Sequence, residues 1–378
     1  MKIKSILVAT MLMAMTAASA ANNTAALLDE LKKELAPDGR TAVWDVSAAT
    51  QKGVLTIYGT VGTQELKDAV TSELNSRGVT NFKNQLIVLE NGVDQEHRWG
   101  QVKLSIATLR CKPSHSAEIA TQGIMGAPVK VLEYGDWCRV VMPDDYIAYV
   151  PESSLAFKTE EQLKTWREAK RYIVTVYDTR LVADPKSDVT VTDLVLGNIL
   201  EYVSKDGKWI CLATPDGRTG WVERSQVAEF SEWAKQDFDV NVIESTARRM
   251  MGSSYLWGGT STKVTDCSGL VKVSYFANGI ILQRDASQQA LTGKKFSDWH
   301  EAVAGDLLFF GNSKTGRVTH VGIYLRDGKY IHCSGQVKIN SLEPDAPDYL
   351  YSPLSLSRID GEVGTRGIIA VRDHKWYF

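Results

Sequence analysis

The alternation of hydrophobic and polar positions changes period along the chain, and the first changes define a small N-terminal module. Four leucines within residues 27–35 recur at helical spacing, and the later segment "GVLTIYGTV" alternates as a strand does. The segment "TQELKDAVTSELNSRG" predicts a helix that ends at Gly78, and "NQLIVLENG" predicts another strand. We therefore expect an αβ module over residues 21–94, in the order helix, strand, helix, strand.

Two later segments repeat one pattern of short strands and turns. Residues 97–157 contain "PVKVLEYGDWCRVVMPDDYIAYVPESSL", and residues 171–229 contain "GNILEYVSKDGKWICLATPDGRTGWVERSQV", so that "GDW" is matched by "GKW" and "YIAYVP" by "RTGWVE". Short strands with tight turns predict two small, closed β-barrels. Residues 158–170 between them predict a helical linker, in which Glu160 stands four residues before Lys164 as a supporting pair.

The last part of the chain, residues 233–378, mixes helical and strand patterns. A helix-forming stretch at its start predicts a helix that ends near Gly252. Apolar positions between 270 and 275 predict another helix, which Gly279 ends. Together with the N-terminal module and the barrels, this pattern predicts a multidomain α+β protein.

Composition supports a globular chain of several domains. The 378 residues are 44% hydrophobic and 23% charged, and single cores stop growing well below this length. With 43 basic and 45 acidic residues, the net charge of -2 gives no reason to expect a nucleic acid or an anionic membrane as partner.

The first twenty residues, "MKIKSILVATMLMAMTAASA", have the basic, apolar and small-residue regions of a secretory signal peptide. Residues 1–20 are therefore expected to be removed, with cleavage after Ala20. The apolar core is too short to span a bilayer, and no cysteine for a lipid anchor follows the cleavage site. We expect an exported mature chain without a membrane anchor, periplasmic or extracellular and associated with the cell wall.

Five cysteines leave at least one free thiol, even in an oxidising compartment. Cys111 and Cys138 fall within one predicted barrel, and the sequence leaves open whether they are bridged or reduced. No pair of cysteines has the spacing of zinc ligands, so we expect neither a metal nor another cofactor.

Cys267 stands in "KVTDCSGLVKVSY", where a loop gives way to a predicted helix that Asp266 or Thr265 would cap. The free N–H groups and the dipole at the helix start favour the thiolate over the thiol. A cysteine in this position can act as a nucleophile if a histidine lies nearby to take its proton.

His320 and His332 are the candidate bases, because they fall on two strands predicted in "RVTHVGIYLRDGKYIHCSG". A two-residue turn between these strands would place the two imidazoles on opposite faces of the sheet. A three-residue loop over 326–328, a type I turn with Gly328 in the left-handed region, would pair Gly322 with His332 and place both rings on one face. We predict the three-residue loop.

In this arrangement Cys267 attacks the substrate and His320 serves as general base and then as general acid. His332 hydrogen-bonds the far nitrogen of His320 and fixes its tautomer, and the backbone N–H of Cys267 holds the oxyanion. A single cysteine or histidine in such a position is most often a packing residue. The joint occurrence of all three in this order favours catalysis.

The residues around these three side chains resemble the NlpC-type family of cell-wall cysteine peptidases, which are papain-like enzymes of bacteria. The resemblance rests on "YLWGG", "TDCSGLV", "RDASQQ", "AGDLLFF", "THVGIYL" and "YIHCSG", which occur in this order. It implies a papain-like domain with Cys267 as nucleophile, His320 as base and His332 as the orienting residue. It also implies hydrolysis of peptidoglycan stem peptides between γ-D-glutamate and a diamino acid.

The two barrels resemble bacterial SH3-like barrels, and their position ahead of such a domain resembles the γ-D-glutamyl-L-diamino-acid endopeptidases. In that subgroup the first barrel helps to wall the cleft, and acidic and hydroxyl groups hold the free amine of the terminal L-alanine. By motif position, the resemblance implies Asp266, Ser268 and Ser287 as substrate contacts, with Asp266 also the helix cap. It further implies Glu118 and Tyr146 of the first barrel, an acid and a phenol suited to an ammonium and a peptide edge.

Other interpretations stay open at this point. The N-terminal module resembles a BON-type domain, a small αβ module of exported bacterial proteins, and we assign it no chemistry. The barrels bind substrate or wall, or serve as spacers. The chain could also be a wall-binding protein with an idle papain-like domain, or an amidase or acyltransferase on the same triad. The sequence distinguishes neither lysine from diaminopimelate in the substrate nor the oligomeric state.

Overall fold

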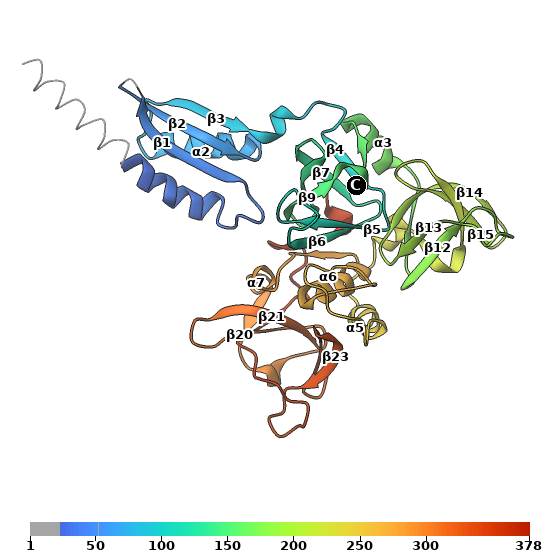
Figure 1. The fold of residues 1–378 in the computed structure, drawn as a ribbon. Coiled ribbons are helices and arrows are strands. Elements are labelled where there is room, and N and C mark those ends of the chain that lie inside the picture. The colour runs from blue at the N-terminus through green and yellow to red at the C-terminus, as the bar shows by residue number, and fades with distance from the viewer. Residues whose placement is uncertain (1–22, 52) are drawn as a thin grey trace, which may run out of the picture. The chain divides into compact units, whose positions relative to one another are not determined.

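The computed structural model describes residues 23–51 and 53–378, and the described chain is a multidomain protein of mostly β-sheet with some helices (Figure 1). The predicted signal peptide, residues 1–20, lies outside the described residues. No helix within the described residues is both long and apolar enough to cross a membrane. The chain divides into two compact units, one made of residues up to 98 with 131–134 and the other of the rest.

The first unit contains a three-stranded sheet that shares one core with two helical segments. Strand β2 pairs antiparallel with β1 and parallel with β3. Leu31 from the helix over residues 23–35, Ile57 from the sheet and Leu74 from the second helix are all fully buried in this core. The elements are β1 (Trp44–Gln51), β2 (Val54–Val61), α2 (Gln64–Ser76), β3 (Lys83–Val88) and the short 3-10 helix η1 (Leu89–Gly92).

Strand β1 is absent from the sequence prediction, so the predicted order of helix, strand, helix, strand was incomplete. Its segment "WDVSAATQ" alternates large apolar and polar residues only over its first four positions, after which small and polar residues follow, and its pairing with β2 makes it a strand. The predicted end of α2 is confirmed, because Gly78 follows the cap residue Arg77 with a left-handed φ of 87°.

The two predicted barrels form two seven-stranded sheets with the same topology. The first has the order β10-β4-β7-β8-β9-β5-β6, and the second has the order β13-β12-β16-β15-β14-β11-β17. If the strands of each sheet are renumbered from the first strand of that sheet, the second order is the first order written in reverse. The two sheets therefore have the same topology, as expected of a repeated unit. The first sheet contains β4 (Trp99–Val102), β5 (Ile106–Arg110), β6 (Ile119–Ile124), β7 (Pro128–Glu133), β8 (Trp137–Val141), β9 (Ile147–Pro151) and β10 (Leu155–Lys158), with η2 (Glu152–Ser154) before its last strand. The second contains β11 (Arg171–Val174), β12 (Asp178–Val182), β13 (Thr190–Val195), β14 (Ile199–Asp206), β15 (Trp209–Ala213), β16 (Thr219–Glu223) and β17 (Val227–Glu229), with η3 (Arg224–Gln226) before its last strand.

The helix predicted between the barrels is α3 (Glu160–Glu168), which a capping box starts. Thr159 Oγ1 accepts from Gln162 N at 3.2 Å, and Gln162 Oε1 accepts from Thr159 N at 2.9 Å. Glu160 does not form the expected pair with Lys164 in this structure. Its carboxylate lies 3.7 Å from Arg167 Nη2 instead.

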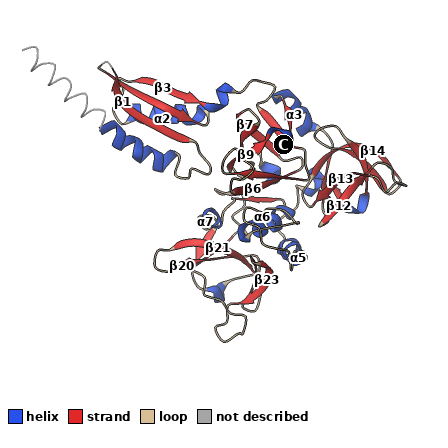
Figure 2. Cartoon of the chain, in the orientation of Figure 1, coloured by secondary structure: helices blue, strands red, loops and turns tan. Residues whose placement is uncertain are grey.

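The last part of the chain combines a six-stranded sheet of order β19-β24-β20-β21-β22-β23 with helices (Figure 2). Alternate strand residues fill two separate cores. Phe309, Val321 and Ile331 pack with α5 and α6, whereas Phe310 and Tyr330 pack on the opposite face of the sheet. The elements are α4 (Phe230–Trp233), α5 (Val240–Arg249), α6 (Cys267–Ala277), β18 (Ile280–Leu282), α7 (Ala286–Gln289), β19 (Lys294–Phe296), η4 (Trp299–Glu301), β20 (Leu307–Asn312), β21 (Arg317–Tyr324), β22 (Lys329–Ser334), β23 (Gln336–Ser341), β24 (Ser355–Arg358), β25 (Ile368–Ala370) and η5 (Val371–Asp373).

The helix predicted before Gly252 is divided in the structure. Helix α4 ends at Trp233, and α5 starts at Val240 after Asp239, whose side chain accepts from Asn241 N. An Asp at a start position competes with helix continuation, because its carboxylate bonds to the local backbone. Gly252, with φ of 82°, follows the end of α5 as expected.

All five cysteines carry free thiols. The possible bridge between Cys111 and Cys138 is not formed in this structure. The odd cysteine count therefore has a simple outcome, in which no cysteine is paired.

Candidate active site

The two candidate histidines share one face of the sheet because the hairpin between them has the predicted register. Gly322 pairs with His332 across β21 and β22, and His320 Nε2 lies 2.7 Å from His332 Nδ1. A Cβ atom at Gly322 would approach Tyr330 Cδ2 to 2.9 Å and His332 Cβ to 3.2 Å. The glycine therefore gives the second ring the space to reach the first.

The turn of this hairpin differs from the prediction, although the register is confirmed. Asp327 and Gly328 both have left-handed φ values, of 52° and 66°, so the predicted type I turn was wrong. Lys329 N donates to Arg326 O at 2.9 Å, while Leu325 N donates to Lys329 O at 2.8 Å. Two residues thus oppose Lys329, and this bulge adds the extra residue that the register requires.

His332 is fully buried and has a further partner on β23. Its Nε2 lies 2.8 Å from Asn340 Oδ1, and Asn340 Nδ2 donates to the backbone carbonyl of Asp348. Asn340 was not predicted from the sequence. A polar residue two positions along the strand from Lys338, which pairs with His332, is the signal that could have identified it.

Cys267 is the first residue of α6, as predicted, and Asp266 is its N-cap. Asp266 Oδ1 accepts from Gly269 N at 2.7 Å. The backbone N–H groups of Ser268 and Val321 act on the Cys267 sulfur and lower its pKa. Because Val321 directly follows His320 on β21, the thiol lies against the strand that carries His320.

Burial reverses the expected ionisation of the thiol. Burial first, and then the carboxylate of Asp266, raise the pKa of Cys267 to about 12, and the helix-start N–H groups only partly oppose this. Burial, followed by the influence of His332 and Lys338, lowers the pKa of His320 to about 3. Burial thus opposes the effect expected of the helix start, and it favours an uncharged thiol and an uncharged imidazole in the resting protein.

A buried ion pair fixes the start of α6. Arg284 is 1% exposed, and its Nη2 lies 2.6 Å from Asp266 Oδ2. Arg284 Nη1 donates to Ser268 Oγ at 2.9 Å, and its Nε donates to Thr121 Oγ1 of the first barrel at 3.1 Å. The sequence analysis missed Arg284, although it stands first in the "RDASQQ" segment.

This network argues against the predicted substrate contacts by Asp266 and Ser268. Asp266 Oδ2 also accepts from Gly258 N at 3.0 Å, so that both carboxylate oxygens are bonded within the protein. Asp266 is 5% exposed and Ser268 is 4% exposed. Asp266 therefore acts as helix cap and partner of Arg284, which leaves no open oxygen for a substrate ammonium. Ser287, the third residue of this predicted set, is half-buried in α7.

The first barrel brings Glu118 and Tyr146 to the catalytic domain. Trp257 Nε1 donates to Glu118 Oε1 at 2.7 Å, and Tyr146 OH donates to Asp285 Oδ2 at 3.1 Å. The carboxylates of Glu118 and Asp285 both raise the pKa of the nearby Cys111 thiol, after burial as the largest cause. Two carboxylates, a phenol and the exposed indole of Trp257 thus gather at this junction, and Asp285 is a residue that the sequence analysis did not name.

Two tyrosines lie close enough to the nucleophile for its thiol to act on their pKa. The pKa of Tyr255 is raised by burial and then by the Cys267 thiol, and the pKa of Tyr351 is raised in the same way. Tyr255 belongs to the "YLWGG" segment, whereas Tyr351 follows β23 in the loop before β24. A phenol is a hydrogen-bond donor, so either hydroxyl is suited to an anionic oxygen formed beside the sulfur.

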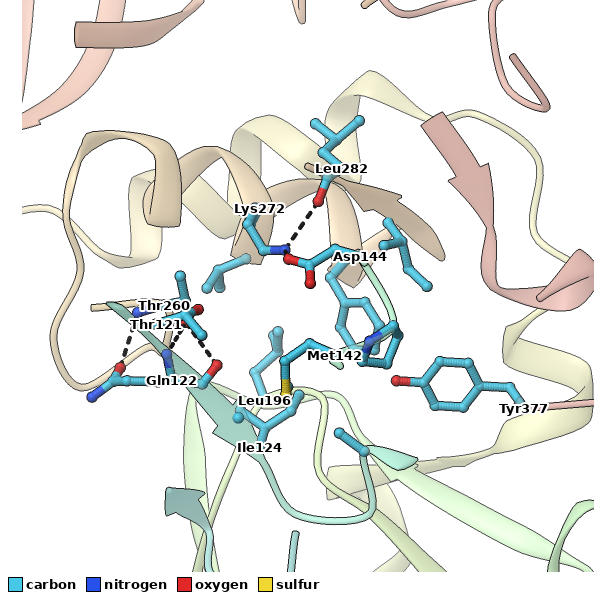
Figure 3. Close-up of a pocket in the computed structure, with 16 residues that line it drawn as sticks. Thr121, Gln122, Ile124, Met142, Asp144, Leu196, Thr260, Lys272, Leu282 and Tyr377 are labelled. Atoms are coloured by element: carbon cyan, nitrogen blue, oxygen red, sulfur yellow. Dashed lines mark hydrogen bonds and ion pairs between the residues drawn. The ribbon is translucent and has the colours of Figure 1, made fainter. Parts of the chain in front are cut away.

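A separate cavity lies where β6 and the loop after β8 of the first barrel approach α6 (Figure 3). An ion pair of Lys272 and Asp144 forms part of its wall, and Lys272 Nζ also donates to Leu282 O at 3.0 Å. Lys272 and Phe276 lie on the side of α6 away from Cys267, which is not among the lining residues. This cavity is therefore not the catalytic site.

Comparison with known proteins identifies the domains. Residues 252–351 match the NlpC/P60 family, and residues 109–155 match the bacterial dipeptidyl-peptidase SH3 domain. Dipeptidyl-peptidase 6 of Lysinibacillus sphaericus is 30% identical over 259 residues, which cover 65% of this chain and 92% of that protein. The γ-D-glutamyl-L-lysine dipeptidyl-peptidase of Bacillus subtilis is 30% identical over 222 residues, covering 57% of this chain and 72% of that protein.

A solved structure supports the fold independently. An NlpC/P60 family protein from Bacillus cereus superimposes with a TM-score of 0.61 at 22% identity, over 69% of this chain and 99% of that chain. At 22% identity, this match is evidence for the fold alone. Taken with the sequence relatives and the site geometry, it leads to one conclusion: the chain belongs to the NlpC/P60 family and carries a bacterial SH3 domain ahead of its NlpC/P60 domain.

Proposed function

We propose that this chain is a cysteine peptidase that hydrolyses the amide bond between γ-D-glutamate and the diamino acid of peptidoglycan stem peptides. The observation that carries the proposal is the Cys267 sulfur at the start of α6, beside the strand that presents the His320 and His332 pair. The relatives named as γ-D-glutamyl-L-lysine dipeptidyl-peptidases support the choice of bond.

The uncharged resting pair defines the order of steps. His320 Nδ1 takes the thiol proton as the sulfur attacks the γ-carbonyl, so that charge appears only as the bond forms. The backbone N–H of Cys267 and the hydroxyl of Tyr255 hold the oxyanion. Protonated His320 then gives its proton to the departing amine of the diamino acid, and a water activated by His320 hydrolyses the thioester.

The acidic groups at the barrel junction suit the free amine of an N-terminal L-alanine. Glu118, Asp285 and the Tyr146 hydroxyl together offer two carboxylates and a phenol, which match the donors of an ammonium. Asp285 directly follows Arg284, which bonds the N-cap of the nucleophile helix, so this group lies close to the reaction site. Asp285 thus replaces Asp266 as the acidic partner of the substrate ammonium. Ser287 of the adjoining helix α7 remains a candidate substrate contact.

Acetylation of the substrate's N-terminal L-alanine is expected to lower kcat/KM about 10- to 100-fold, because hydrogen bonds to a charged group are worth roughly 1.5–3 kcal/mol. The measurement compares free and acetylated L-Ala-γ-D-Glu-diamino-acid peptides by mass spectrometry of the products. The variant Asp285→Asn should reduce the difference in kcat/KM between the free and the acetylated peptide. The variant Glu161→Gln, on the exposed face of α3, should leave this difference unchanged. Equal rates on both peptides would point to a broad endopeptidase.

The pH profile should lack the usual histidine step. Because His320 has a pKa of about 3, the base stays neutral as the pH falls from 8 to 5, and activity is lost only as the pH falls towards 3. Short initial-rate assays of kcat/KM between pH 4 and 8 measure this. The variant Lys338→Gln removes a cation that lowers the pKa of both histidines, so its acid limb should move to higher pH. A wild-type loss centred near 6.5 would contradict the depressed pKa.

The location and the N-terminal module belong to the same proposal. We place the mature chain outside the cytoplasm, at the cell wall, on the strength of the signal-peptide pattern in residues 1–20. The module over residues 21–94 is proposed to be BON-like, supported by its pattern and by its small helix-and-sheet fold. A defined panel of stem peptides, assayed with lysine or diaminopimelate in the third position, tests the substrate class.

A further inference from the structure

The hydrogen bonds behind the catalytic histidines run in one direction only. Their end point is the backbone carbonyl of Asp348, a group that accepts hydrogen bonds and never donates them. Asn340 must therefore present its NH₂ group to this carbonyl, and its oxygen Oδ1 to His332. The orientation of this amide is set by the backbone.

The amide orientation determines where the histidine protons lie. Because Asn340 Oδ1 can only accept, His332 carries its proton on Nε2, 2.8 Å away. The Nδ1 of a neutral His332 is then an acceptor and takes a hydrogen bond from Nε2–H of His320, at 2.7 Å. The unprotonated nitrogen of His320 is consequently Nδ1, the atom that must receive the thiol proton.

We propose that Asn340 is a positioning residue that, held by the Asp348 carbonyl, fixes both histidines in the Nε2–H tautomer and so makes His320 Nδ1 the catalytic base. The kinetic part of this inference rests on the proposed function, whereas its tautomer part does not. Neither the nucleophile, the base nor the third residue has this role.

The surroundings of the two rings supply no second acceptor for this purpose. Lys338 on β23 acts on both imidazoles as a cation, and the Tyr330 ring lies tilted beside His332 with ring centres 4.8 Å apart. The carboxylate of Asp266, at the start of α6, raises the pKa of His320 but is outweighed by burial, His332 and Lys338. Of these groups, Asn340 is the one that accepts from His332 Nε2, at 2.8 Å.

The same chain of bonds connects the catalytic pair to a surface loop. Asp348 lies between β23 and β24, and Lys329 Nζ approaches its carboxylate to 3.5 Å. Tyr351 lies on the same loop, and its pKa is raised by burial and then by the Cys267 thiol. The loop that accepts the hydrogen bond from Asn340 is thus also the loop that carries Tyr351.

The direct test is the tautomer pattern of the full-length protein labelled with ¹⁵N-histidine. Long-range ¹H–¹⁵N spectra of the wild type should show His320 and His332 protonated on Nε2, with assignments from His320→Gln and His332→Gln. The variant Asn340→Leu, of similar volume but without an acceptor, should give mixed tautomers. A wild-type spectrum with Nδ1–H on either ring would overturn the inference without any assay of activity.

The kinetic test compares two substitutions of one residue. Asn340→Leu should lower kcat about 10- to 100-fold with little change in KM, since only the protonation pattern is disturbed. Asn340→Asp retains an acceptor for His332 Nε2, so it should keep the tautomers and recover most of kcat, with an acid limb moved to higher pH. Asn312→Leu, at an exposed turn of the same sheet, serves as the matched control and should retain wild-type kcat. Unchanged kcat and tautomers in Asn340→Leu would overturn the inference. A folded Asn340→Asp with a kcat no higher than that of Asn340→Leu would also overturn it. An inactive wild type with the expected tautomers would refute only the proposed function.

Discussion

Replacing Cys267 with alanine is expected to lower kcat on stem peptides by a factor of about 10⁴ to 10⁶, the range typical of removing a nucleophile. The sulfur is the atom that forms the acyl intermediate, and no other described cysteine stands at the start of α6 against the strand of His320. Product release from a defined peptide, followed by mass spectrometry, measures the effect.

The control for this substitution is another buried cysteine. Cys211→Ala in the second barrel removes a thiol of similar burial and should leave kcat unchanged. Cys267→Ser keeps the shape of the side chain but offers a far weaker nucleophile, so it should be nearly as inactive as the alanine variant. Substantial turnover by Cys267→Ala, with the same product bond, would remove the peptidase mechanism.

Replacing Arg284 with methionine is expected to lower the free energy of unfolding of this part of the chain by about 3–5 kcal/mol. The substitution leaves the Asp266 carboxylate buried without its cation, and this penalty is typical of breaking a buried pair from one side. Urea unfolding followed by fluorescence measures the change. The exposed pair of Arg180 and Asp188, 3.8 Å apart, provides the comparison, since Arg180→Met should cost less than about 1 kcal/mol.

A double substitution separates the pair from its surroundings. Asp266→Asn removes the buried charge, so Arg284→Met should cost less in the Asp266→Asn background than in the wild type. If the two changes were simply additive, the Arg284 contact with Asp266 would not be the interaction that stabilises the start of α6.

The sequence predicted those features that depend on local pattern. The periods of α2 and α6, the repeated barrel strands and the left-handed glycine after α2 are all local, and each appears in the structure. Strand β1 was missed because its apolar alternation covers only Trp44 to Ser47, and the small and polar residues that follow carry little periodic signal. The division between α4 and α5 was missed for a similar reason, since Asp239 acts through a local bond that hydrophobic spacing does not reveal.

The site shows the same limit more sharply. Cys267, His320 and His332 were found because their spacing and the hairpin register are sequence properties. The pKa of the Cys267 thiol could not be inferred in this way, because burial outweighs the helix start and burial is a tertiary property. Arg284 and Asn340 were missed for the same reason, because each acts on residues that only the fold brings close.

The bond between Arg284 and Thr121 has a consequence for how this protein can be divided. A side chain that braces the nucleophile helix also reaches into the first barrel, and Thr260 exchanges hydrogen bonds with the backbone of Gln122 on the same barrel strand. Expression of residues 233–378 alone would leave the Arg284 guanidinium and other polar groups without these partners, on a surface newly exposed to water. The catalytic domain is thus not independent of the first barrel, and a fusion of this domain to another protein should include that barrel as well.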